Sequence, residues 1–156
     1  MPKKSAGLLM YKIENNVVYY FLVHPGGPFW KNKDAGAWSI PKGEIEDHEN
    51  NELETAIREM KEETGITAKE PFIDLGEIKQ KSGKIVHCWA FQGDFSGLFL
   101  CQSMVEMEFP PESGKKIKFP EVDKAEMFAK EEAKNKILPA QYEFIERLEK
   151  ILLSKL

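Results

Sequence analysis

Three glutamates near the end of one predicted helix are the side chains most suited to chemistry. Glu59, Glu62 and Glu63 stand at positions i, i+3 and i+4, so they share one helix face. They repel one another there, and the partial negative charge of a helix C-terminus disfavours them further, with only Arg58 as a nearby counter-charge. A hard divalent cation such as Mg²⁺ resolves this conflict because it binds carboxylate oxygens. The spacing therefore favours a metal site over a solvated acidic face.

A short turn stands just before this helix. The segment Trp38-Ser39-Ile40-Pro41-Lys42-Gly43 leads from a strand end into it. Gly43 has no side chain, so its backbone can approach a bound ion closely and its carbonyl can serve as a ligand. A Pro-Lys-Gly turn alone is most often only a turn, so its place beside the glutamates is what makes it a candidate.

The charge of the chain is concentrated in the same segment. The 156 residues have a formal net charge of −4. Residues 44–63 hold nine acidic and two basic side chains, so the rest of the chain is slightly positive. A cluster of this sign attracts cations and repels the phosphates of nucleic acid. We therefore expect no duplex nucleic-acid partner.

Length and composition predict one globular domain over residues 1–156, with 42% hydrophobic residues to build its core. No stretch approaches the roughly 18 apolar residues of a membrane span, and the apolar run behind the first lysines is too short for a signal peptide. Cys88 and Cys101 form no paired-cysteine motif. We expect a cytoplasmic protein with no membrane partner and no disulfide scaffold.

The glutamates must be positioned by a mixture of strands and helices. Residues 50–64 have apolar side chains at i, i+3, i+4 and i+7, followed by Gly65, which predicts the central helix. Residues 6–13 and 17–23 predict a β-hairpin, and a second helix is predicted from Pro139 onward. Further strands are expected at 37–40, 72–78, 85–91, 104–109 and 125–128, with loops at 24–30 and 115–118. The predicted fold class is α+β, a mixed β-sheet with a central and a C-terminal helix.

The segment from Gly43 to Ile66 resembles the Nudix box, the loop–helix–loop signature of Nudix hydrolases. The family pattern is Gly, five residues, Glu, seven residues and then Arg-Glu-U-x-Glu-Glu-x-Gly-U, where U is aliphatic. The stretch from Arg58 to Ile66 matches the second half, and Gly43 and Glu49 match the first. One residue is extra, because eight residues separate Glu49 from Arg58. The pairing of the arginine is therefore open between Glu49 and Asn50, although a longer turn before the helix can absorb the insertion.

The resemblance implies an α/β/α sandwich that hydrolyses a nucleoside diphosphate linked to another group, with Mg²⁺ or Mn²⁺ as cofactor. By position, Glu59, Glu62 and Glu63 would hold the metal, directly or through water. The Gly43 carbonyl would assist them, Arg58 would orient them, and one glutamate can act as the base. Bound cations would also allow the acidic site to accept an anionic diphosphate.

An acid outside the box often completes the site in this family. Glu121, which follows Pro120 and precedes Met127 by six residues, is predicted to bind the metal or to act as the base. Glu106 and Glu108 are its rivals for this role.

Substrate-binding residues are expected in and beside the Pro/Gly-rich loop. Trp30 is predicted to stack on a nucleobase, and Lys31 and Lys42 to meet distal phosphates. Among the substrates of this family, we expect a small-molecule nucleotide, namely a dinucleoside polyphosphate or a nucleoside triphosphate. The alternatives are a diphosphoinositol or sugar-nucleotide pyrophosphatase, or a non-catalytic Nudix sensor or binding module. Homodimers are common in the family, so a homodimer is a further expectation.

Overall fold

A β-hairpin begins the fold of the computed structural model, which describes residues 4–97 and 99–154. Strand β1 (Lys4–Glu14) pairs antiparallel with β2 (Val17–Pro25). Asn15 and Asn16 join the two strands with φ values of 54° and 65°. Asparagine tolerates this left-handed backbone, which a two-residue type I′ turn requires at both positions. The predicted hairpin is confirmed, and its turn is encoded locally.

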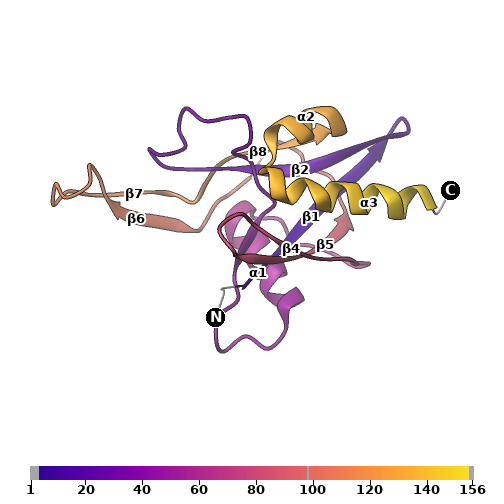
Figure 1. Ribbon diagram of the computed structural model, residues 1–156, viewed down its shortest axis with the longest axis horizontal. Coiled ribbons are helices and arrows are strands. Elements are labelled where there is room, and N and C mark those ends of the chain that lie inside the picture. Colours follow the sequence, from indigo (N-terminus) through magenta and orange to yellow (C-terminus); the bar gives the residue numbers. More distant parts are fainter. Residues whose placement is uncertain (1–3, 98, 155–156) are drawn as a thin grey trace.

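A mixed six-stranded sheet grows around this hairpin in the order β4-β5-β1-β2-β8, with β3 also paired to β1 (Figure 1). The added strands are β3 (Lys42–Glu44), β4 (Ile73–Lys79), β5 (Ile85–Gln92) and β8 (Val122–Ala129). Strand β5 runs parallel to β1, whereas β2 and β3 run antiparallel to it. The central strand β1 therefore has neighbours of both directions.

The first helix, α1 (Glu52–Thr64), covers one face of the sheet. Its N-terminus is capped by the Asn51 side chain, and Gly65 ends it with a left-handed φ of 81°. Its buried residues Ala56 and Met60 pack in one core cluster with Leu8 and Phe21 of the hairpin. The predicted central helix and its glycine cap are confirmed, with a start two residues later than expected because residue 51 is the cap.

The last helix, α3 (Tyr142–Ser154), covers the opposite face and follows a 3-10 turn at Pro139–Gln141. Phe144, Ile145 and Leu148 are buried in a second cluster that includes Leu9 and Leu22. Residues 8 and 9 of β1 thus point to opposite clusters, as the alternation of a strand requires. Helix α2 (Lys130–Lys136) lies beside α3 in Figure 1, which completes the α/β/α layers of the predicted α+β fold.

A separate two-stranded sheet extends away from the body of the fold. Among the described residues, strand β6 (Met104–Glu108) pairs only with β7 (Lys116–Pro120), and Figure 1 shows this hairpin standing out from the main sheet. The prediction of a loop over 115–118 is therefore wrong. The alternation in Lys-Ile-Lys-Phe is the sequence signal for this strand, since its isoleucine and phenylalanine are less exposed than its lysines.

Two other predictions need correction. Residues 37–40 form only isolated bridges at Trp38 and Ser39, whereas the strand begins at Lys42, where a turn was expected. Residues 42–44 become extended because they pair with residues 5–7 of β1, a contact that local sequence does not encode. Helix α2 was missed because Ala133 is its single buried residue, so it has no apolar period. Within the described residues, no helix is both long and apolar enough to cross a membrane.

Candidate active site

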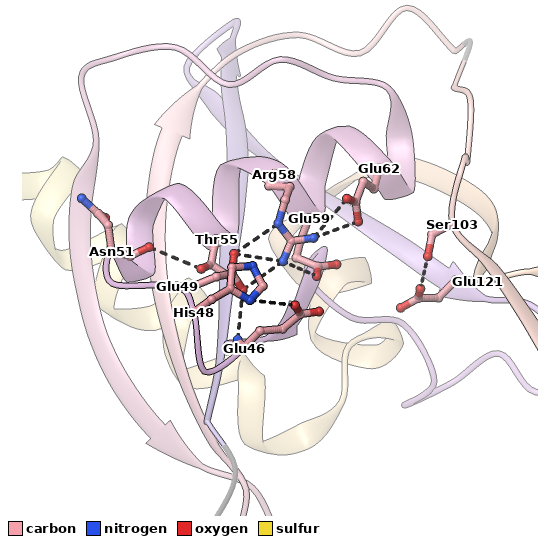
Figure 2. A network of polar contacts seen from close by, with 10 residues as sticks. All are labelled: Glu46, His48, Glu49, Asn51, Thr55, Arg58, Glu59, Glu62, Ser103 and Glu121. Carbon is pink, nitrogen blue, oxygen red and sulfur yellow. Dashed lines mark hydrogen bonds and ion pairs between the residues drawn. The ribbon is translucent and has the colours of Figure 1, made fainter.

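Arg58 stands at the centre of the acidic face of α1 and contacts three carboxylates (Figure 2). Its Nε and Nη2 atoms donate to Glu49 at 3.1–3.2 Å. Its Nη1 donates to both oxygens of Glu62 at 3.0 and 3.1 Å, and Nη2 lies 3.2 Å from Glu59 Oε1. A planar guanidinium can serve several carboxylates at fixed angles, which a lysine ammonium cannot. Arg58 therefore fixes the directions of the acidic side chains.

The extra residue before α1 leaves this arrangement intact. Glu49, not Asn50, pairs with Arg58, so the open question about the register is answered. Glu49 also accepts a hydrogen bond from the backbone N–H of Glu46 at 3.0 Å. The helix cap at Asn51 accepts from the N–H of Glu54 at 3.1 Å. The longer turn is thus fixed at Glu49 and at Asn51 by these hydrogen bonds, and the extra residue lies before the helix.

Glu59 is brought against the backbone of Gly43. A Cβ atom at residue 43 would lie 2.0 Å from Glu59 Cδ and 2.2 and 2.4 Å from its two oxygens. Burial raises the pKa of Glu59, and the nearby charges of Glu62 and Glu121 raise it further, against the lowering effect of Arg58. The two residues predicted to share a cation therefore touch.

Glu63 is the most buried acid of the site, with 3% of its surface exposed. Burial raises its pKa well above the ordinary value, and the charges of Glu121 and Glu59 raise it further. Lys42 opposes this effect, and burial in turn lowers the pKa of Lys42. One carboxylate oxygen of Glu63, Oε2, is buried without a hydrogen-bond partner among the described residues.

Glu121 joins the site from the junction of β7 and β8. Its Oε2 accepts a hydrogen bond from Ser103 Oγ at 2.5 Å, and the two residues lie beyond the C-terminal end of α1 in Figure 2. Its backbone N–H donates to the Ser103 carbonyl, and the Ser103 N–H donates to the Glu62 carbonyl at 3.2 Å. Ser103 thus ties residue 121 to the helix. A lone serine before an edge strand gave no sequence signal for this role.

The rivals of Glu121 lie elsewhere. Glu106 and Glu108 are exposed on β6, and Glu106 is 3.8 Å from Lys116 across the hairpin. The carboxylate of Glu121, by contrast, raises the pKa of both Glu59 and Glu63. The geometry brings together Gly43, Glu59, Glu63 and Glu121, with Glu62 turned toward Arg58 and 42% exposed.

The donor set of this cluster fits a divalent cation. Hard cations bind carboxylate and carbonyl oxygens, and those are the donors that the four residues offer. A buried, unpartnered carboxylate oxygen costs free energy unless something binds it, and Glu63 Oε2 is such an atom. The repulsion among the three carboxylates is removed by the same binding event. The cluster is therefore a candidate metal centre on its own structural evidence.

A cleft of about 180 Å³ opens beside the carboxylates. Its lining includes Trp30, Ser39, Lys42, Glu63 and Glu121. Two of the three predicted substrate-binding residues, Trp30 and Lys42, thus face the site. Lys31 is exposed and does not belong to this lining. The cleft thus combines a lysine with the carboxylates of the candidate metal centre.

A second group of metal-ligating side chains, Glu52, Glu77 and His87, lies at the N-terminal end of α1. Lys4 already bridges its two carboxylates, because its ammonium pairs with Glu77 and lies 2.9 Å from Glu52 Oε1. His87 Nδ1 is 3.0 Å from the same Glu52 oxygen. Each of the three side chains therefore has an ion-pair or hydrogen-bond partner within the protein, without a metal ion.

Comparisons with known proteins bear on the family and the fold of the chain. A family model described as NUDIX domain matches residues 1–148. The asymmetrical bis(5'-nucleosyl)-tetraphosphatases of Rattus norvegicus and Mus musculus are 29% identical over 101 residues, which span 57% of this chain and 64% of theirs. The NUDIX domain of Shewanella oneidensis NrtR complexed with ADP ribose superposes with a TM-score of 0.69 at 14% identity, covering 97% of this chain and 89% of that one. A C. elegans Ap4A hydrolase binary complex gives 0.67 at 21% identity, covering 97% and 98%.

Proposed function

Because the chain belongs to the Nudix family, we propose that it is a pyrophosphohydrolase that cleaves a diphosphate linkage in a nucleoside polyphosphate. The observation that carries this proposal is a cluster of three acids beside a cleft that Lys42 lines. Glu59 lies against the Gly43 backbone, and Glu63 and Glu121 are close enough to act on its charge and on each other's. The similarity to asymmetrical tetraphosphatases favours a dinucleoside polyphosphate over other members of that substrate class.

We propose Mg²⁺ or Mn²⁺ as the cofactor. Glu59, Glu63 and Glu121 would hold it directly with the Gly43 carbonyl, and Glu62 would contact it through water because its oxygens are occupied by Arg58. When bound, such a cation neutralises the carboxylates, binds phosphate oxygens and lowers the pKa of a coordinated water.

The side chains then divide the remaining work. Lys42 attracts the phosphate chain into the cleft, and Arg58 keeps the glutamates in fixed directions. One site carboxylate accepts the proton of the attacking water while a new P–O bond forms. The bridging P–O bond breaks, and the leaving phosphate takes the electron pair. The hydrolysis therefore consumes one water and needs no other co-reactant.

A substrate panel tests the proposal. Diadenosine tetraphosphate, nucleoside triphosphates, ADP-ribose, a sugar nucleotide and a diphosphoinositol phosphate are incubated with the protein and Mg²⁺ or Mn²⁺. We expect hydrolysis of diadenosine tetraphosphate to unequal nucleotide products, with ¹⁸O from labelled water in one of them. EDTA and Glu63→Gln should each abolish it. Hydrolysis of only the sugar nucleotide or only the diphosphoinositol would show that the substrate is not a nucleoside polyphosphate. If no compound is hydrolysed with either metal, the enzyme assignment is wrong.

We further propose a reducing, cytoplasmic location. Cys88 is buried and Cys101 is partly buried, and both are free thiols. Burial raises the pKa of the Cys88 thiol well above its usual value, which makes this cysteine unreactive.

A further inference from the structure

A second cleft, of about 300 Å³, adjoins the one that holds the carboxylates. It lies between residues 25–30 and the β6–β7 hairpin, and it shares Pro25, Trp30 and Glu121 with the first cleft. Small-molecule sites typically measure about 300–1,000 Å³, so the two clefts together have the size of one site. A ligand that occupies the first cleft can therefore continue into the second past Glu121.

The second cleft has fewer charged side chains in its lining than the first, which includes Lys42, Glu63 and Glu121. The hairpin contributes Val105, Met107 and Phe119, and residues 25–30 contribute prolines, glycines, Phe29 and Trp30. Among the described residues that line it, Glu121, at the junction with the first cleft, is the single charged side chain, and none has a side-chain amide or hydroxyl. The joint groove is thus ionic at one end and apolar with aromatic rings at the other.

Close backbone contacts hold the two walls of the second cleft together. A Cβ atom at Gly27 would lie 2.4 Å from Phe119 Cε2, and one at Gly26 would lie 2.1 Å from the Pro120 carbonyl oxygen. The Gly26 N–H also donates to the Glu121 carbonyl at 2.9 Å. The walls therefore have a fixed separation before any ligand binds, which lowers the entropic cost of binding.

A buried histidine fixes the far end of the same loop. His24 is 1% exposed, with Nδ1 2.7 Å from Asp123 Oδ1 and Nε2 2.6 Å from the Lys33 carbonyl oxygen. The Lys33 ammonium lies 5.2 Å from the Trp30 ring centre. The loop that carries Trp30 is thus fixed before residue 30, at His24, and after it, at Lys33. The cleft wall that Trp30 forms is therefore held in place without a ligand.

We infer that this second cleft binds the nucleobase of the substrate, with the β6–β7 hairpin as one of its walls, and that it accepts different bases with similar affinity. The inference rests on the proposed function, since it assigns one half of the groove to the phosphates and the other to the base. Aromatic and apolar surfaces bind any base by its flat face, whereas discrimination needs hydrogen bonds to the base edge. The lining offers aromatic and apolar surfaces, but its side chains offer almost no hydrogen-bonding groups to a base edge.

The kinetic test compares two methionines on opposite faces of β6. Met107 lines the cleft, whereas Met104 is 47% exposed and does not line it. Met107→Ala should raise KM for diadenosine tetraphosphate and ATP about tenfold with kcat nearly unchanged, whereas Met104→Ala should change neither. The kcat/KM values of ATP, GTP, CTP and UTP should agree within about tenfold. Equal KM values for both variants, or a preference above a hundredfold for one base, would overturn the inference.

A binding test separates this inference from the proposed function. Trp38 and Trp89 are buried, so Trp30 is the tryptophan most accessible to a ligand. Uncharged adenosine and cytidine should both quench tryptophan fluorescence in EDTA, and Trp30→Phe should abolish the change. Quenching without hydrolysis of any nucleotide would contradict the enzyme assignment alone. Hydrolysis with no quenching by either nucleoside would contradict the cleft assignment alone.

Discussion

The carboxylate of Glu59 fills the space that any side chain on residue 43 would need, 2.0 Å from an added Cβ. Residue 43 must therefore be glycine because of this contact, and not because of an unusual backbone angle. The contact joins β3 to α1, so the loop and the helix of the candidate metal centre are fitted to each other.

Gly43→Ala should inactivate the enzyme while leaving it folded. The clash falls on the flexible end of Glu59, which can turn away, so we expect a melting temperature within a few degrees of the wild type. Displacing the carboxylate by about 1 Å should lower kcat about 100-fold. Glu59→Gln serves as the control, because the double variant should lose little beyond either single one. Additive losses in kcat would show that the two residues act independently.

Glu63→Gln should stabilise the metal-free protein, whereas Glu62→Gln should not. The raised pKa of Glu63 means that its ionisation costs folding free energy above the ordinary glutamate pKa. The amide removes this cost, so we expect a melting temperature about 2–6 °C higher at pH 7.5 in EDTA. Glu62→Gln loses an exposed ion pair to Arg58 and should be neutral or slightly destabilised.

The pH dependence checks the sign of this effect. Glu63 keeps its proton in the folded state to a higher pH than in the unfolded state, so its cost disappears as the pH falls toward the unfolded value. The difference between Glu63→Gln and the wild type should therefore shrink toward pH 4.5. A difference that grows on acidification would show that the Glu63 carboxylate stabilises the fold.

Mg²⁺ should stabilise the folded protein in proportion to its binding. At a free concentration 100 times Kd, one site adds about 2.7 kcal/mol to the free energy of unfolding. Thermal melting with increasing Mg²⁺ should show this rise in the wild type, and EDTA should reverse it. Glu106→Gln, on the remote hairpin, should keep the full shift, and Glu63→Gln should lose most of it. An equal shift in both variants would place the cation elsewhere.

Glu121→Gln should reduce kcat strongly with little change in KM. Its carboxylate faces Glu59 and Glu63, so its loss falls on the transition state and not on ground-state binding. Glu106→Gln and Glu108→Gln should retain near-normal kcat because both side chains are exposed on β6. Steady-state kinetics of the three variants decides between them.

Arg58→Lys should keep the fold but lower kcat by about 10–100-fold. An ammonium cannot contact Glu49, Glu59 and Glu62 with the fixed geometry of a guanidinium, so the ligand directions become loose. Crystal structures of the two proteins with Mg²⁺ would show whether the carboxylates move. An active lysine variant would mean that Arg58 supplies charge alone.

Much of the metal centre could be predicted because it is a local pattern. Glu59, Glu62 and Glu63 share one turn of helix, so their proximity follows from the 3.6-residue period alone. Their different surroundings do not follow from it. Glu63 is buried because it lies on the same face of the helix as Ala56 and Met60, which packs against the sheet, whereas the Glu62 side chain is 42% exposed.

The remaining elements of the site depend on contacts between distant parts of the chain. The strand at Lys42 exists because residues 42–44 pair with β1, and the bond from Ser103 to Glu121 spans 18 residues. Whether Glu49 would still reach Arg58 after an insertion also depended on the three-dimensional course of the turn. Spacing in the sequence specifies the helix, whereas these contacts become visible only when the sheet is assembled.

The attachment of the β6–β7 hairpin has a consequence for how this protein can evolve. The hairpin contributes one wall of the apolar cleft, yet within the part of the chain that the structure describes its strands pair only with each other. Mutations or length changes in it therefore alter no hydrogen bond of the six-stranded sheet and no residue of the acidic helix. This wall of the apolar cleft can therefore change during evolution while the strand pairing of the six-stranded sheet is conserved.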